Sequence, residues 1–279
     1  MKNFREFFRR LTRKKITVIC LVILTLIVFA VIFSLFVAPY GYDDQNYRER
    51  MLAPSLAHLC GTDNYGRDIF SRLLYGGRIS LLIGISVSLI TTVIGGLIGC
   101  AAAYFGGRTD NLIMRFFDIM GAIPPMLLSM VVAATLGTGI FNTILALVIS
   151  GIPGKARTAR GPVLALRSQE YIEAATALNT PTFKIILRHI FPNIMAPMIV
   201  QTTLSISRNI VQVSSLSFLG LGVQPPTPEW GQMLSAGRSF LRDCPWMVLA
   251  PGLIMMLTLF SLNIVGDAVR DALDPKLKD

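Results

Sequence analysis

The stretch SQEYIEAATALNTPTFKIILRHIFPN, residues 168–193, is a polar and basic island between long apolar runs. Ser168 is a candidate N-cap for a first short helix. Asn179 is a candidate left-handed residue at the end of that helix, and Thr180-Pro181 would supply the N-cap and first-turn proline of a second helix. The stretch predicts an exposed, amphipathic helix–turn–helix connector. An ordinary juxtamembrane connector, basic because it is cytoplasmic, explains the same composition equally well.

The composition around this island indicates an integral membrane protein. Of 279 residues, 53% are hydrophobic and 15% are charged, which leaves too few polar residues to cover a soluble globule of this size. The net charge of +10 comes from basic residues that flank apolar runs, without interleaved aromatic side chains. The pattern therefore predicts membrane topology and lipid contact, and no nucleic-acid partner.

The N-terminal segment, residues 1–15, is strongly basic and predicts a cytoplasmic, amphipathic stretch lying along the membrane surface. Its apolar positions are Phe4, Phe7, Phe8 and Leu11. Residues 16–38 carry no charge and are long enough to cross a hydrocarbon core of about 30 Å, so they predict the first transmembrane helix rather than a cleavable signal.

Residues 39–78 are balanced in acidic and basic side chains and predict an external loop with a scaffold helix. The turn-forming run from Gly61 to Asp68 precedes an amphipathic helical stretch, Ile69 to Tyr75, that leads into the next span. Cys60 and Cys244 are both expected outside, where they could form a bridge or stay as two unpaired thiols.

The core transmembrane domain is predicted over residues 79–269. Its second span, 79–107, contains Gly95, Gly96 and Gly99, a pattern that suits close helix packing. A short inside loop is expected from Arg108 to Arg115.

The uncharged run 119–154 is too long for one crossing and predicts two spans. Gly137-Thr138-Gly139 would supply the turn between them, and Pro124-Pro125 would kink the first of the two.

A basic loop, 155–194, is expected in the cytoplasm, followed by a span at 195–219 and another at 244–266. With a cytoplasmic tail at 270–279, the prediction is an all-α, polytopic protein with six transmembrane helices and both termini in the cytoplasm.

Catalytic chemistry is not indicated by any motif in the sequence. The nearest candidate for a phosphate-binding loop, Gly154-Lys155, is followed by Ala156 and lacks the earlier glycine, so no nucleotide site is predicted. We predict no metal site, no cofactor and no catalytic residue. Arg208 is the one ionisable residue expected well inside a span, so any transport would draw its energy from another chain.

Several motifs together resemble one family. The run Glu173-Ala174-Ala175, the turn at Asn179 and the sequence His189 to Asn193 resemble the EAA loop of permease subunits in bacterial ATP-binding-cassette importers. Further motifs are similar to the second, "C"-type permease of the dipeptide/oligopeptide/nickel importers. These are Gly61-Thr62-Asp63, Gly66-Arg67-Asp68, Arg78 to Leu81, Ser217 to Pro226, Trp230-Gly231, Gly266-Asp267, Arg270-Asp271 and Asp274-Pro275.

This resemblance implies a type I ABC importer permease fold in the bacterial cell (inner) membrane and a non-catalytic role. The expected partners are a second permease subunit in a heterodimer, two cytoplasmic ATP-binding subunits that hydrolyse ATP, and an external solute-binding protein. By the same resemblance, the residues that couple to the ATPase are Glu173, Ala174, Ala175, Leu178, Asn179, Pro192 and Asn193. The solute would be a dipeptide or oligopeptide, with a glutathione-like peptide or a nickel chelate as the alternative.

Three positions depart from the family pattern. Asn179 stands where the family usually has glycine, and Asn can hold the same left-handed conformation. Arg208 and Val213 replace a small residue and an acid. Arg208, with Gln212 four residues later, could face the translocation path, where it would favour an anionic solute. Alternatively, Arg208 pairs within the permease dimer or snorkels toward the membrane interface.

Overall fold

The computed structural model describes residues 11–12 and 14–273, and this part of the chain is almost entirely helical. The predicted apolar positions Phe4, Phe7 and Phe8 and the tail from 274 onward lie outside the described residues. The main helices are α2 (Lys15–Ile32), α4 (Ile69–Phe105), α5 (Gly107–Gly121), α6 (Pro125–Leu136), α7 (Ile140–Arg167), α10 (Phe191–Phe218) and α12 (Trp246–Leu273). The shorter elements are α3 (Ser34–Val37), η1 (Tyr47–Glu49), α8 (Glu170–Ala177), α9 (Thr182–Ile185), the π-helical segment η2 (Ile186–Ile190), α11 (Trp230–Gly237) and η3 (Arg238–Phe240).

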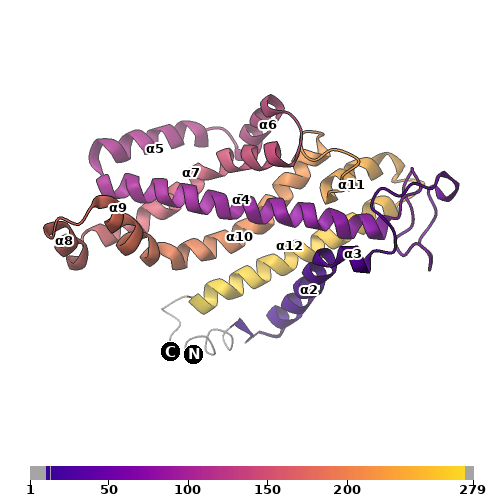
Figure 1. Cartoon of the computed structure of the whole chain (residues 1–279), viewed down its shortest axis with the longest axis horizontal. Coiled ribbons are helices and arrows are strands. Elements are labelled where there is room, and N and C mark those ends of the chain that lie inside the picture. The colour runs from indigo at the N-terminus through magenta and orange to yellow at the C-terminus, as the bar shows by residue number, and fades with distance from the viewer. Residues whose placement is uncertain (1–10, 13, 274–279) are drawn as a thin grey trace.

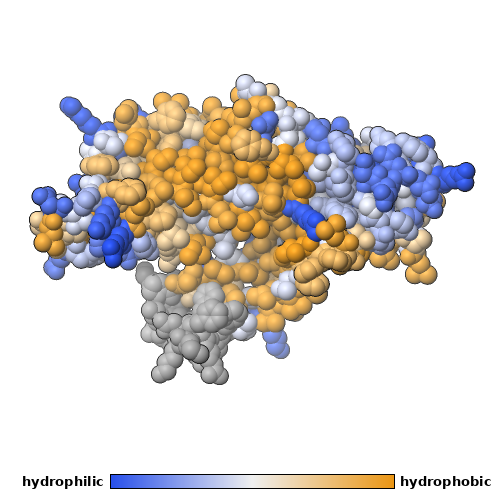
Figure 2. Space-filling view, in the orientation of Figure 1, coloured by the Kyte–Doolittle hydropathy of each residue, from blue (hydrophilic) through white to orange (hydrophobic). Residues whose placement is uncertain are grey.

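The long helices run roughly along one axis, with α4 near the centre (Figure 1). Hydrophobic side chains form a broad band across the visible face, and hydrophilic ones collect at the two ends (Figure 2). The α8–α9 connector lies at one end of the long axis and residues 38–68 lie at the other (Figure 1). This distribution is that of a protein that crosses a membrane, with polar segments on both sides.

The predicted six spans are matched only in part, and their exact number stays a prediction. By length and composition, four helical stretches of the described chain can cross a membrane, or five if the bent pair α5–α6 counts as one. The expected span within 140–154 is the first half of α7, which is uncharged but continues into a basic second half ending at Arg167. Because that uncharged half is only about 22 Å long at ~1.5 Å per residue, it does not qualify by itself.

The region predicted as a short inside loop at Arg108–Arg115 is instead part of α5, and that prediction is wrong. Asp110 accepts a bidentate pair of hydrogen bonds from Arg160 of α7, with contacts of 2.6–3.1 Å. Asp118 pairs with Arg157 of α7 at 2.8 Å. Of the charges that suggested a loop, Asp110 is thus balanced by a residue of the neighbouring helix.

The turns expected around α6 are confirmed. Gly137 and Gly139 both have positive φ and separate α6 from α7. Pro124 precedes α6, and α5 and α6 meet at 85° there. The predicted kink is therefore a full corner, because a proline both lacks an N–H and restricts the residue before it.

The close helix packing predicted from the glycines of α4 is also confirmed. A methyl group at Gly95 would lie 2.7 Å from Cβ of Lys155, and one at Gly99 would collide with the backbone of Ala156. On the facing helix, a methyl group at Gly151 would lie 2.9 Å from the Thr91 side chain. The α4–α7 backbones therefore approach as closely as small residues allow.

The first described residues and the last ones lie side by side. Lys14 Nζ and Asp271 Oδ2 are 3.0 Å apart, so the start of α2 and the end of α12 share one end of the helical body. The C-terminal segment expected to begin at 270 is helical as far as Leu273.

The segment before α4 is organised by charged side chains. Asp68 caps α4 by accepting the Ser71 N–H at 2.7 Å, and its other oxygen contacts Nδ1 of the buried His58 at 2.9 Å. Arg67 donates to Asp63 at 2.7 Å. The amphipathic stretch from Ile69 begins a single helix that continues without a break into the predicted second span.

Cys60 and Cys244 are free thiols that pack in the same apolar cluster at this end of the molecule. Burial raises the pKa of the Cys60 thiol, and the Asp68 carboxylate adds to the rise. Thiols with raised pKa values are poor nucleophiles near neutral pH, which agrees with a packing role.

Candidate functional site

The end of α8 is a Schellman turn centred on Asn179. The Thr180 N–H donates to the carbonyl of Ala175 at 3.1 Å, and the Asn179 N–H donates to the carbonyl of Thr176 at 2.9 Å. Asn179 has φ +57°, so the predicted left-handed conformation is confirmed. This pair of bonds satisfies carbonyls that the helix end would otherwise leave free, and it turns the chain sharply toward α9.

The two predicted N-caps of the connector are displaced. Ser168 does not cap α8, since its hydroxyl donates to the carbonyl of Ala165 in the preceding helix. Gln169 occupies the N-cap position of α8, and Pro181 rather than Thr180 occupies that of α9. Both prediction errors are of one residue, and the stretch does form two short helices with a break.

The connector is anchored to the transmembrane body by a few isoleucines. Ile172 is the buried residue of α8, and Ile185, Ile186 and Ile190 join it in an apolar cluster with residues of α4 and α7. Ala175 packs against this cluster. A force on α8 would therefore reach α4 and α7 through packed side chains.

The remaining coupling candidates are exposed. Glu173, Ala174 and Asn179 face solvent, and Leu178 is 81% exposed. Leu178 is thus a large apolar side chain, at the C-terminal end of an anchored helix, that the described part of the chain leaves largely uncovered.

The beginning of α10 closes the connector. Pro192 and Asn193 are exposed, and the Asn193 amide donates to the His189 carbonyl at 2.6 Å and to the Tyr171 hydroxyl at 3.3 Å. The π-helical segment η2 ends two residues before Pro192, a proline that cannot donate to the preceding turn. Asn193 thus ties α10 back to α8.

An open groove of about 520 Å³ lies beside this junction, and both apolar and basic side chains line it. Its lining residues are Pro181, Phe183, Lys184, Leu187, Arg188 and Pro192. Phe183 is 73% exposed. The groove, Leu178 and Glu173 together form the exposed surface of the connector.

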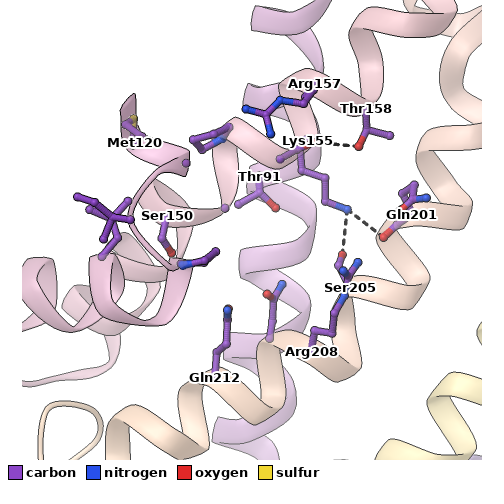
Figure 3. A pocket seen from close by; sticks show the side chains of 18 residues that line it. Thr91, Met120, Ser150, Lys155, Arg157, Thr158, Gln201, Ser205, Arg208 and Gln212 are labelled. Carbon is purple, nitrogen blue, oxygen red and sulfur yellow. Dashed lines mark hydrogen bonds between the residues drawn. The ribbon is translucent and has the colours of Figure 1, made fainter. Parts of the chain in front are cut away.

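A separate cavity of about 330 Å³ lies between α7, α10, α4 and the α5–α6 corner. The predicted residues Arg208 and Gln212 line it, and Ser205 and Gln201 join them from the same face of α10 (Figure 3). This face is a polar stripe at helical spacing within a membrane helix. No hydrogen bond or ion pair joins Arg208 to any other residue in the described part of the chain.

Lys155 is a cavity residue that sequence reasoning missed. It was expected at the start of a cytoplasmic loop, but α7 continues through it to Arg167, and its side chain is 8% exposed. Nζ donates to the Gln201 carbonyl at 2.9 Å and to the Ser205 hydroxyl at 3.0 Å, which links α7 to α10 (Figure 3). Between Lys155 and Arg167 the sequence contains no clear helix C-terminus, which indicates that the helix continues through Lys155. Pro153 and Pro162 obscure this signal, because prolines usually interrupt helices.

Comparison with known proteins assigns most of the chain to family models. Residues 93–279 match the model described as "Binding-protein-dependent transport system inner membrane component". Residues 2–54 match "N-terminal TM domain of oligopeptide transport permease C".

Curated relatives align over nearly the whole chain. A dipeptide transport system permease protein of Alkalihalophilus pseudofirmus is 42% identical over 99% of this chain and 90% of the relative. A di/tripeptide transport system permease protein of Pseudomonas aeruginosa is 41% identical, with 99% and 93% covered. A glutathione transport system permease protein of Escherichia coli is 42% identical, with 99% and 91% covered.

Proposed function

Because the chain belongs to the family of binding-protein-dependent transport system inner membrane components, we propose that it pairs with a second, related permease to form the translocation path of an ATP-driven importer. In this heterodimer two cytoplasmic ATP-binding subunits hydrolyse ATP, and an external solute-binding protein delivers the solute. The chain itself is a transport component of the inner membrane and performs no catalysis.

In the proposed topology the chain crosses the membrane six times and both ends are cytoplasmic. The crossings are α2, α4, the α5–α6 corner, α7, α10 and α12. The salt bridge between Lys14 and Asp271 supports placing both ends on one side. The separation of α8–α9 from residues 38–68 along the long axis supports placing the connector inside and the loop outside (Figure 1).

The observation that carries the coupling role is the anchored but exposed α8. Ile172 is buried against the transmembrane body, whereas Glu173, Ala174 and Leu178 are free for a partner. Docking of this surface in a cleft of an ATP-binding subunit would transmit the closure of the ATPase dimer to α4 and α7 as a rigid-body movement.

The proposed solute is a dipeptide or a small oligopeptide, by similarity to relatives named for dipeptide and di/tripeptide transport. The relative named for glutathione transport supports a glutathione-type peptide as the alternative, and a nickel chelate is a further one. Selection among these solutes would also depend on the solute-binding protein.

The test is uptake by the reconstituted importer with and without its ATP-binding subunits, in wild type and in Glu173→Lys. We expect wild-type uptake to need the ATPases, and uptake by Glu173→Lys to fall about tenfold or more, because each ~1.4 kcal/mol lost at an interface weakens it tenfold. Peptide-stimulated ATP hydrolysis and uptake are measured on the same vesicles.

Glu170→Lys is the matched control. Both glutamates lie in the first turn of α8, so both reversals remove the same favourable interaction with the helix N-terminus. Equal losses in the two variants would assign the effect to helix stability and not to docking. Uptake without any ATPase would instead indicate a self-sufficient channel or secondary carrier.

A further inference from the structure

The cavity between α7 and α10 contains positive charge that no lining acid balances. Lys155 projects from α7 and Arg208 lies on α10, while the described residues that line the cavity include no Asp or Glu (Figure 3). Both side chains line the same cavity, so their positive charges repel one another. Two like charges that repel one another in a confined space favour the binding of an anion between or beside them.

Other arginines in the same region have acidic partners. Arg157, which also lines the cavity, pairs with Asp118 at 2.8 Å. Arg160 is held by Asp110 through a bidentate contact. Arg208 makes no such pair within the described chain, so its charge is available to a ligand.

Lys155 is positioned rigidly and has bonding capacity left. An ammonium group carries three N–H donors, and the Gln201 carbonyl and the Ser205 hydroxyl account for two of them. The close contact of its Cβ with Gly95 fixes the base of the side chain against α4. The third N–H can therefore serve a bound oxygen with little loss of side-chain entropy.

The rest of the lining suits a peptide-like molecule. Ser150, Asn209 and Gln212 present neutral hydroxyl and amide groups, which can bond to amide groups of a solute. Among the described residues that line the cavity, no carboxylate is present to receive an ammonium or guanidinium group. The cavity is thus complementary to solutes with net negative charge and unfavourable for cationic ones.

We propose that this cavity binds a carboxylate of the transported solute and that Lys155 and Arg208 are the residues that select it. The inference rests on the proposed transport function, since it names the chemical class that the path accepts best. It favours peptides with an additional carboxylate, such as those ending in Asp or Glu, over neutral peptides, and both over peptides rich in Lys or Arg.

The direct test is ligand protection of a cysteine placed in the cavity. In an importer whose native cysteines are replaced, Gln212→Cys is labelled with a neutral methanethiosulfonate, and the dipeptides Glu-Glu, Ala-Ala and Lys-Lys are added in turn. We expect Glu-Glu to protect at the lowest concentration and Lys-Lys at the highest. Arg208→Gln should raise the concentration of Glu-Glu needed for half protection by at least about fivefold.

Three further variants separate charge from fold. Arg208→Lys should keep most of the Glu-Glu protection, and Lys155→Gln should weaken it as Arg208→Gln does. Arg115→Gln, which removes an exposed arginine of α5 outside the cavity lining, should leave protection unchanged. If Lys155→Gln does not assemble, the Arg208 pair of variants still decides the outcome.

Uptake measured in parallel distinguishes a failure of the carboxylate site from a failure of the proposed transport function. Equal protection by the three dipeptides, or protection unaffected by Arg208→Gln, would overturn the carboxylate site even where ATP-driven peptide uptake is normal. Charge-dependent protection without any peptide uptake would leave the site standing and reject the proposed solute class. An unchanged ratio of Glu-Glu to Ala-Ala uptake in Arg208→Gln would assign Arg208 to pairing with the second permease and overturn its role in selection.

Discussion

Asn179 is a residue whose backbone conformation can be tested directly. At φ +57° glycine is unstrained and asparagine is strained less than most residues. For alanine this left-handed conformation costs about 1 kcal/mol of folding free energy, and proline cannot adopt it at all. We expect ATP-dependent uptake to be kept in Asn179→Gly, reduced up to about fivefold in Asn179→Ala and abolished in Asn179→Pro. The measurement is initial uptake normalised to the amount of inserted importer. Normal uptake in Asn179→Pro would contradict a coupling role for this turn.

Asn179 and Lys155 also show why some single residues could be predicted and others could not. The left-handed turn depends on neighbours in sequence, since its two hydrogen bonds end at Ala175 and Thr176. The position of Lys155 depends on the Gln201 carbonyl, 46 residues away. A basic residue beside prolines and glycines gives no local sign that α10 will supply acceptors for it, so it was assigned to a loop.

At the scale of helices, the glycine pattern of α4 was informative and the charges of α5 were misleading. Gly95 and Gly99 predict a close neighbour whatever that neighbour is, and α7 fills that place. The charges at Arg108, Asp110 and Arg115 suggest a loop only while their surroundings are unknown. In the structure Arg160 of α7 donates to Asp110 and holds the helix α5 to the transmembrane body.

The α4–α7 contact predicts opposite effects for two glycine-to-alanine changes. A methyl group at Gly99 would overlap the backbone of Ala156, whereas one at Gly154 of α7 meets no atom within 4 Å apart from its chain neighbours. Gly99→Ala should destabilise the protein by about 1–3 kcal/mol and lower its melting temperature in detergent. Gly154→Ala should stabilise it by about 0.5–1 kcal/mol, because alanine is the better helix former. An equal fall in the melting temperatures of the two variants would contradict the close approach of α4 and α7.

For the whole molecule, composition and charge distribution predict a helical membrane protein, while the number of crossings stays a prediction. The predicted six depends on dividing the uncharged run 119–154 into two crossings. In the structure the run 119–154 is divided between a corner of 85° and a helix that continues into basic sequence. At the corner the N–H groups of Ala122 and Ile123 donate to carbonyls of the last turn of α5, so the backbone there is bonded within the chain. Whether an uncharged run bends or stays straight depends on its packing against other helices, which the run itself does not show.

The orientation of the whole chain can be tested with three introduced cysteines in a cysteine-free background. Leu56 is 99% exposed in the segment before α4, Leu178 is 81% exposed in the connector, and Asp271 lies at the end of α12 beside Lys14. A membrane-impermeant maleimide should label Leu56→Cys in intact spheroplasts, and Leu178→Cys and Asp271→Cys should react only in inverted vesicles, with a contrast of about tenfold or more. Each cysteine is also labelled after detergent lysis to confirm that it can react. Labelling of Leu178→Cys from outside would place the connector on the side of the membrane away from the ATPases. The proposed topology, six crossings with both ends cytoplasmic, would then be wrong, and α8 could not transmit ATPase movements to α4 and α7.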